Sequence, residues 1–147
     1  MKNPIIRKTL ESDIDHIMII EKEGGGVWKR EYFLNELKNP FSLFLSAFTD
    51  GNLSGFAVVW SAADELQLNN IAVSKNQRRS GIGRALLEFI EKYPYKQKPA
   101  RIFLEVREKN LTAIKFYETL GFKVTGTRKN YYGDDNAVLM EKKLDEI

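Results

Sequence analysis

The stretch "NIAVSKNQRRSGIGRALLEFI", residues 70–90, joins a β-rich run to an amphipathic helix through a polar loop with two glycines. Apolar residues recur at helical spacing after Gly81, and Pro94 ends the helix. A glycine-rich first turn leaves unpaired backbone N–H groups and the positive end of the helix dipole facing one spot. The spacing predicts a pocket for an anion of diphosphate size around Gly81 and Gly83, where a side chain would keep a phosphate from the backbone.

Two other phosphate-binding motifs do not fit this loop. A Walker loop requires lysine and then serine or threonine after its last glycine, but Arg84 and Ala85 stand there. A dinucleotide fingerprint requires glycines directly after the strand and a third glycine where this chain has Leu86. Spacing alone leaves two alternatives open: a helix start with solvated arginines, and a nucleic-acid contact.

The composition is typical of one globular domain, and we expect a single domain over residues 1–147. Of the 147 residues, 43% are hydrophobic, which is enough for a sizeable core. The 23 basic and 20 acidic residues leave a net charge of only +3, so charge does not argue for nucleic acid. The chain has no cysteine, which excludes disulfides, thiolate metal sites and a thiol nucleophile. We expect a cytoplasmic protein with no membrane segment, no signal peptide and no metal.

Residues 1–69 contain the strands and helices that we expect to precede this loop. Three β-rich runs, with an Asp50-Gly51 turn between the first two, predict an antiparallel meander over 41–50, 52–62 and 65–73. Two helices precede it, over 12–23 and 29–39, joined by a flexible hinge at "GGGVW". Ser12 and Asp15 resemble a capping box for the first helix, and a short strand at 4–7 comes before it.

The second half adds a strand, a helix and a hairpin. "ARIFLEVRE" over 100–108 reads as a strand, and 110–122 as a helix with Asn110 or Thr112 as N-cap and Gly121 as its left-handed cap. Residues 123–132 and 136–144 predict a hairpin around Gly133. The order β-α-α-β-β-β-α-β-α-β-β predicts an α/β fold with a mixed, mostly antiparallel sheet and helices on both faces.

Several motifs at this spacing resemble one enzyme family. "NIAV" followed by Arg78, Arg79, Gly81 and Gly83, in the pattern Q/R-x-x-G-x-G/A, is similar to the acetyl-CoA signature of the GCN5-related N-acetyltransferases (GNAT). "LEVREKN", "AIKFYETLGF" and "RKNYY" resemble the RimI-type ribosomal-protein alanine N-acetyltransferases. The resemblance is close over residues 65–144 and covers the first 64 residues only by element order.

The resemblance implies acetyl-CoA as the cofactor, with coenzyme A as the product. It implies that the pyrophosphate is held at Arg78, Arg79, Ser80, Gly81, Ile82, Gly83 and Arg84, mainly by backbone amides. It also implies that the pantetheine arm pairs with Ile71, Ala72 and Val73 like an added strand and is hydrogen-bonded by Asn110.

The resemblance also implies two catalytic residues. Glu105 shares a strand face with Phe103 and Arg107 and, without the family, would be read as a solvated or ion-paired glutamate. In the family the matching glutamate is the general base, acting through water. Tyr117 would otherwise be a core aromatic, and in the family the matching tyrosine protonates the departing coenzyme A sulfur. Without cysteine or a histidine-centred triad, direct attack by the amine is favoured over an acyl-enzyme.

The expected acceptor is the N-terminal α-amine of a protein or peptide, such as a ribosomal protein. Freeing a lysine amine costs roughly 3.5 kcal/mol more than freeing an α-amine at neutral pH, which suits a modest base. The resemblance places Trp28, Tyr131 and Tyr132 at the acceptor, although the proline usual before the tryptophan is replaced here by Val27. Three alternatives stay open: a lysine or small-molecule amine as the acceptor, a silent acyl-CoA-binding module, and a ribosome- or RNA-binding module. We expect no direct nucleic-acid or membrane partner.

Overall fold

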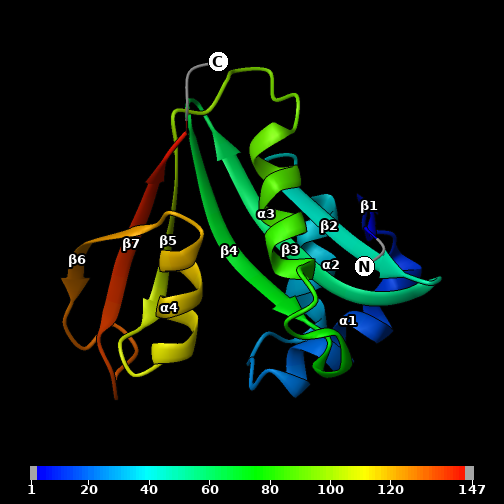
Figure 1. The fold of residues 1–147 in the computed structure, drawn as a ribbon, viewed down its shortest axis with the longest axis horizontal. Helices are drawn as coiled ribbons and strands as arrows, with labels where there is room; N and C mark the ends of the chain where they lie inside the picture. The colour runs from blue at the N-terminus through cyan, green and yellow to red at the C-terminus, as the bar shows by residue number, and fades with distance from the viewer. Residues whose placement is uncertain (1–2, 145–147) are drawn as a thin grey trace. The chain divides into compact units, whose positions relative to one another are not determined.

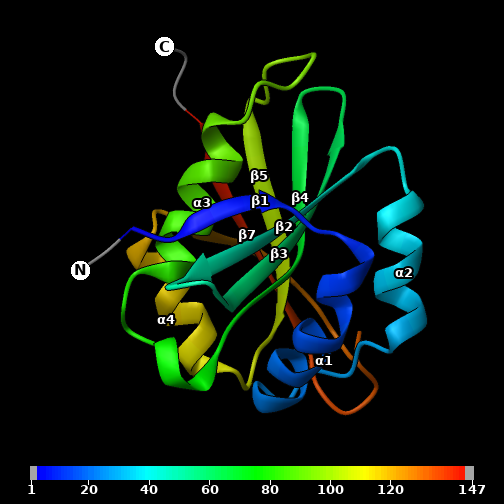
Figure 2. The same ribbon diagram turned by 90° about the vertical axis from the view of Figure 1, so that its right-hand side faces the viewer.

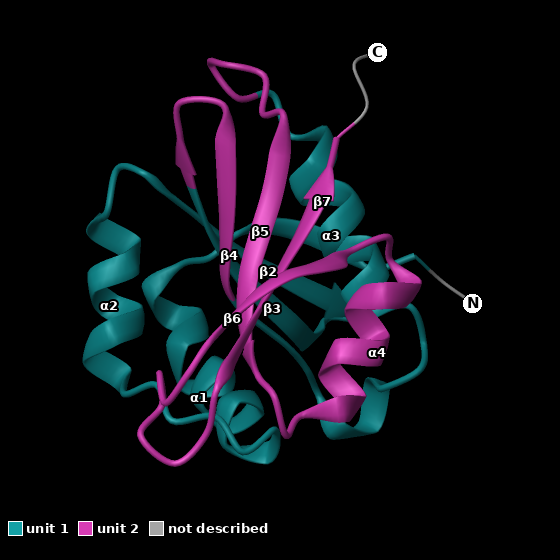
Figure 3. Cartoon of the chain, turned by 90° about the vertical axis from the view of Figure 1, so that its left-hand side faces the viewer, with its two compact units in different colours: residues 1–60, 70–94 teal, residues 61–69, 95–147 magenta. Residues whose placement is uncertain are grey.

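A computed structural model describes residues 3–144 of the chain, which form two compact units. Of the described residues, unit 1 comprises 3–60 and 70–94, and unit 2 comprises 61–69 and 95–144 (Figure 3). The expectation of a single domain stays a prediction.

The described residues form seven strands, four α-helices and two short 3-10 helices (Figure 1). In chain order these are β1 Ile5–Lys8, η1 Glu11–Asp13, α1 Ile14–Glu23, α2 Arg30–Lys38, β2 Ser42–Thr49, β3 Asn52–Ala62, β4 Glu65–Val73, η2 Lys75–Gln77, α3 Ile82–Lys92, β5 Arg101–Arg107, α4 Leu111–Thr119, β6 Lys123–Arg128 and β7 Ala137–Lys143. The strand order is β1-β2-β3-β4-β5-β7-β6, with β4 and β5 parallel and the β1–β2, β2–β3, β5–β7 and β6–β7 pairs antiparallel. The predicted element order and mixed sheet are confirmed.

The core of unit 1 contains helices on both faces of β2 and β3 (Figure 2). On one face, Phe33 of α2 lies 5.8 Å from Phe44 of β2 and 5.4 Å from Phe56 of β3, measured between ring centroids. On the other face α3 comes so close that a Cβ at Gly55 would lie 2.9 Å from Ile82 Cγ2. Glycine at position 55 therefore allows the helix that follows the polar loop to pack directly on β3.

The start of the first helix differs from the prediction. Ser12 lies within η1, and the capping carboxylate belongs to Asp13, whose Oδ2 accepts from the Leu10 N–H at 2.8 Å and from Arg7 Nη1 at 2.8 Å. Although burial opposes the charged form, the hydrogen bond from Arg7 holds the pKa of Asp13 below its usual value. Asp15 pairs with Arg30 instead of capping the helix. The Ser12 and Asp15 capping box is wrong because the arginine of β1 selects Asp13.

The "GGGVW" segment, which we expected to be a flexible hinge, begins with a hydrogen-bonded cap on α1. The Gly24, Gly25 and Gly26 N–H groups donate to carbonyls of the last turn of α1, at 3.2, 3.0 and 2.9 Å. Gly25 takes a left-handed φ of +77°, which favours glycine. The segment therefore leaves α1 in a defined direction.

In unit 2, β5, the strand that carries Glu105, lies between β4 and β7. β5 pairs with β4 in parallel at Glu65↔Arg101, Leu66↔Ile102 and Gln67↔Phe103, and with β7 along its whole length. Its side chains alternate as expected, with Ile102, Leu104 and Val106 buried and Glu105 on the opposite face. The expected N-cap at Asn110 is confirmed, because its side chain accepts from the Ala113 N–H at 3.1 Å. Gly121 has a left-handed φ of +97° and Gly133 of +83°, as the helix end and the hairpin require.

Candidate active site

The residues predicted for the site fall into two groups, one in each unit. Unit 1 holds Trp28, Ile71–Val73 and Arg78–Arg84, and unit 2 holds Glu105, Asn110, Tyr117, Tyr131 and Tyr132. Each group is built from neighbouring elements of its own unit.

In unit 1, the loop before α3 takes a conformation suited to an anion. Gly81, the N-cap of α3, has a left-handed φ of +85° and is followed by the right-handed helix. Ala85 is the first donor of the helix ladder, with its N–H 2.9 Å from the Gly81 carbonyl, so the N–H groups of Ile82 and Gly83 precede the ladder. A left-handed residue followed by a right-handed one turns successive N–H groups toward one concavity. The loop therefore presents backbone donors of the kind that an anion can accept from.

Glycine is required at position 81 for its backbone angle. A Cβ built there would meet no protein atom within 4 Å, so packing within the protein does not select glycine. Arg79 also has a positive φ, +66°, which is uncommon for a residue with a side chain. Such strained backbone angles are concentrated at binding sites, where the surrounding structure holds them in place.

The same loop is braced against the end of α1. The Lys75 N–H donates to Glu23 Oε1 at 3.1 Å, and Arg78 Nη2 donates to the Glu23 carbonyl at 3.4 Å. Ser80 Oγ donates to the Gln77 carbonyl. Arg78 thus places its guanidinium at a helix C-terminus, where a cation is favourable. Arg78, Arg79 and Arg84 are all exposed.

Trp28 lies at the edge of the unit 1 core, next to a buried carboxylate that the sequence did not identify as functional. Its ring is 5.2 Å from that of Phe33, and its backbone N–H donates to Glu21 Oε2 at 3.0 Å. Glu21 is only 4% exposed, and its Oε1 accepts from Asn70 Nδ2 at 3.1 Å. The signal in the sequence was a glutamate on the apolar face of a helix, in phase with Ile14 and Ile17.

In unit 2, Glu105 lies beside an arginine that the sequence analysis also missed. The Glu105 side chain is 18% exposed, and its Oε1 lies 3.4 Å from Nη1 of Arg128 at the end of β6. Both line a cavity of about 190 Å³ whose other walls include Glu65, Arg101 and Glu141. The candidate base is therefore paired with a cation and faces a small, charged hollow.

The hairpin tyrosines contact two arginines, and one of these, Arg128, pairs with Glu105. The Tyr131 and Tyr132 ring centroids are 5.1 Å apart, with the Arg128 guanidinium 5.5 Å from the Tyr131 ring and that of Arg107 4.3 Å from the Tyr132 ring. Burial, and then the negative charge of Glu105, raise the pKa of Tyr132. Tyr131 is thus linked to the candidate base through Arg128, and Tyr132 is close enough for the charge of Glu105 to affect its pKa.

Tyr117 and Asn110 lie on α4. The Tyr117 ring packs 5.7 Å from Phe122 and 5.5 Å from Phe116, and burial raises the pKa of Tyr117 to about 12. The phenol therefore keeps its proton at neutral pH and can donate it. Asn110 uses its carbonyl oxygen for the helix cap, which leaves its amide NH₂ as the donor for a ligand.

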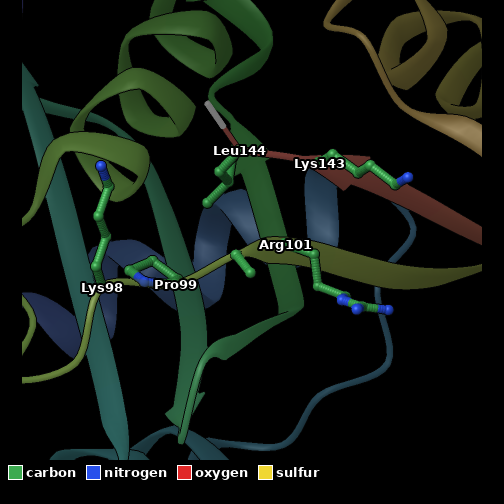
Figure 4. A pocket seen from close by; sticks show the side chains of 6 residues that line it. Lys98, Pro99, Arg101, Lys143 and Leu144 are labelled. Carbon is green, nitrogen blue, oxygen red and sulfur yellow. The ribbon is translucent and has the colours of Figure 1, made fainter. Parts of the chain in front are cut away.

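A larger cavity, of about 540 Å³, lies at the other end of β5 (Figure 4). It is lined by Lys98, Pro99, Ala100, Arg101, Lys143 and Leu144. Glu105 lies four residues further along the strand from Arg101, a distance of about 13 Å. This cavity is therefore separate from the candidate base.

None of the helices formed by residues 3–144 is both long and apolar enough to cross a membrane. No cluster of three or more histidine, aspartate or glutamate side chains suited to a metal ion occurs in the same range.

Comparison with known proteins defines the class of this chain. The model of the acetyltransferase (GNAT) family matches residues 13–122. The chain therefore belongs to the GNAT family. It is an acetyl-CoA-dependent N-acetyltransferase, and the predicted family, activity and cofactor are confirmed.

Within this family, the chain is similar to several named N-acetyltransferases. The chain is 32% identical, over 96% of both chains, to a Bacillus subtilis (strain 168) protein provisionally named a ribosomal protein bS18-alanine N-acetyltransferase. The crystal structure of the ribosomal-protein-S18-alanine N-acetyltransferase from Escherichia coli matches with a TM-score of 0.86 and 31% identity, covering 98% of this chain and 96% of that one. An N-acetyltransferase from Thermoplasma acidophilum in complex with coenzyme A matches with a TM-score of 0.79 and 27% identity, covering 97% and 99%.

Proposed function

We propose that this enzyme acetylates the α-amine of a protein N-terminus, and that the acceptor is the N-terminal alanine of ribosomal protein bS18. The names of the Bacillus subtilis and Escherichia coli relatives support this acceptor. The observation that carries the proposed chemistry is the setting of Glu105, a largely buried carboxylate at a small cavity walled by the hairpin that bears Tyr131 and Tyr132.

The proposed proton transfers use two residues of unit 2. The acceptor reaches the enzyme mainly as an ammonium, and Glu105, acting through water, takes its proton. Acetyl-CoA, when bound, supplies the thioester carbonyl that the freed amine attacks, with cleavage of the carbon–sulfur bond. The Tyr117 hydroxyl gives its proton to the departing sulfur, and the second proton, which the attacking nitrogen loses as the amide forms, restores the phenol. Its pKa of about 12 keeps it protonated until that moment.

The proposed binding residues divide by the chemical group that they hold. Backbone N–H groups of Arg79–Arg84 hold the pyrophosphate, with the Arg78 side chain bracing the loop. Main-chain groups of Ile71–Val73 and the amide of Asn110 hold the pantetheine arm. Trp28, Tyr131 and Tyr132 contact the acceptor peptide.

The test measures coenzyme A release with a panel of acceptors. The panel contains the bS18 N-terminal peptide, peptides with other first residues, lysine peptides with blocked N-termini, and polyamines. We expect the free alanine terminus to give the highest kcat/KM. A reaction with the blocked lysine peptides alone would exclude the α-amine.

A pair of variants tests the base. Glu105→Gln should lower kcat by roughly 10²- to 10⁴-fold, the usual contribution of general base catalysis. Glu108→Gln is the matched control, because Glu108 is an exposed glutamate just after the end of the same strand. Equal rates for the wild type and Glu105→Gln would remove Glu105 from the mechanism.

A further inference from the structure

We infer that Glu21 is a positioning residue, whose buried carboxylate fixes the loop between α1 and α2 and thereby sets Trp28 for the acceptor peptide. The inference rests on the proposed assignment of Trp28 to the acceptor. All the contacts that carry it lie within unit 1.

The Glu21 carboxylate joins three segments that are distant in sequence. It belongs to α1, accepts from the loop through the Trp28 N–H at 3.0 Å, and accepts from β4 through Asn70 Nδ2 at 3.1 Å. Asn70 directly precedes Ile71, the first of the residues proposed to hold pantetheine. One side chain therefore connects the loop to the strand that carries part of the cofactor site.

The loop is shaped to lie against this carboxylate. A Cβ at Gly26 would lie 2.3 Å from both Cδ and Oε2 of Glu21 and 2.6 Å from Oε1. These separations are well inside van der Waals contact, so any side chain at position 26 displaces either the loop or the carboxylate. Gly26 has no left-handed φ, so clearance alone explains its lack of a side chain.

The burial of Glu21 requires an explanation beyond packing. At 4% exposure the carboxylate has lost almost all contact with water, which is costly unless hydrogen bonds replace it. An apolar residue of similar size would fill the space without that cost. What it could not do is accept hydrogen bonds from the Trp28 N–H and from Asn70, which points to loop placement as the role of the glutamate.

Two substitutions separate hydrogen bonding from charge and volume. Glu21→Leu keeps the volume and removes both acceptors, whereas Glu21→Gln keeps an acceptor for Trp28 and can donate to Asn70 once that amide turns over. We expect the peptide KM to rise about tenfold in Glu21→Leu and less than about threefold in Glu21→Gln. We expect kcat at saturating peptide and the Kd for acetyl-CoA to stay within about twofold. The exposed Glu31→Leu on α2 is the matched control.

Each departure from this pattern overturns the inference. An equal rise of KM in Glu21→Gln and Glu21→Leu would mean that the negative charge itself acts on the acceptor. A parallel rise in the Kd for acetyl-CoA would indicate general loosening of the unit. An unchanged peptide KM in both variants would mean that acceptor binding does not depend on Glu21.

A double-substitution cycle tests the contact with Gly26. Gly26→Ala alone should raise the peptide KM about tenfold, because its Cβ meets the carboxylate. In the Glu21→Ala background the same substitution should add less than about twofold, because the carboxylate is gone. Additive effects would show that the two residues do not act through this contact.

Fluorescence follows the loop independently of activity. The chain has two tryptophans, so Trp60→Phe leaves Trp28 as the only indole. In that background Glu21→Leu should raise acrylamide quenching of Trp28 about twofold or more, and unchanged quenching would refute the positioning of the loop by Glu21. An unchanged peptide KM in Trp28→Ala would instead refute the proposed acceptor role of Trp28. That result would remove the functional half of the inference, even with the quenching change present.

Discussion

Tyr117 is half-buried, and its loss of contact with water makes the stability of the enzyme depend on pH in the alkaline range. The substitution Tyr117→Phe isolates this dependence. Packing against Phe116 and Phe122 raises the pKa of Tyr117 in the folded protein to about 12, against an ordinary value of 10.0 in the unfolded chain. A raised pKa means that the folded state disfavours the phenolate. The corresponding stability is fully present below pH 10 and is lost as pH rises through 12.

The size of the effect follows from linkage. A difference of two pKa units corresponds to about 2.7 kcal/mol once both states are ionised. At pH 11 the unfolded state is already mostly ionised and the folded state is not, so the wild type has lost about 1.4 kcal/mol relative to its own stability at pH 9. Tyr117→Phe has no phenol at this position and lacks this loss.

The assay is urea unfolding of the wild type and Tyr117→Phe at pH 9, 10 and 11, in parallel with coenzyme A release. The free-energy difference between the two proteins should be constant up to pH 9.5 and shift by about 1.4 kcal/mol by pH 11. The difference absorbance spectrum between them should show one tyrosine ionising near pH 12. A Tyr117 that titrates near 10, with no shift in the free-energy difference, would refute the reasoning from burial.

Two further predictions concern the proposed cofactor site. Gly81→Ala should weaken acetyl-CoA binding about tenfold by calorimetry, because alanine leaves the left-handed φ in the free loop and regains it on binding at a cost of about 1–2 kcal/mol. Gly51→Ala, also at a positive φ with no Cβ contact, should lower the melting temperature similarly and leave the affinity unchanged, and equal affinities in both variants would exclude the loop from the site. Asn110→Ala should cost about 1 kcal/mol of unfolding free energy through its lost cap. It should also weaken acetyl-CoA binding, whereas a loss of stability alone would reduce Asn110 to a cap.

Local sequence predicted most of the fold because its boundaries are set by local chemistry. The Asp50-Gly51 turn has two positive φ angles, 51° and 82°, and fixes where β2 ends and β3 begins. Asn110 caps α4 with its own side chain three residues ahead of its donor. The error at the first helix has the opposite cause. Arg7 lies on β1 and pairs with Asp13, so Asp13 and not Ser12 caps the helix start. The residues around the helix start do not reveal this pairing.

The site was less predictable because its residues acquire their roles from distant partners. Glu105 and Tyr117 gained proposed roles only through family resemblance, since a glutamate on a strand and an aromatic on a helix are ordinary features. The partner of Glu21 on β4 is 49 residues away, and Arg128 reaches Glu105 from a different strand. Sequence spacing carries no information on such pairs until the strand order is known.

The glycines of this chain show how one residue type serves two physical needs. Gly81 is required for a left-handed backbone angle that directs N–H groups outward, in a place with room for a side chain. Gly26 is required for clearance, because a buried carboxylate occupies the place where a Cβ would lie. No substitution of a neighbouring residue should therefore offset the strain of a side chain at position 81. The clash of a side chain at position 26 should be offset by shortening Glu21. In the proposed acceptor loop a paired substitution thus removes the clash but also loses the positioning by Glu21, while the proposed phosphate loop is held by a backbone conformation that side-chain exchange cannot replace.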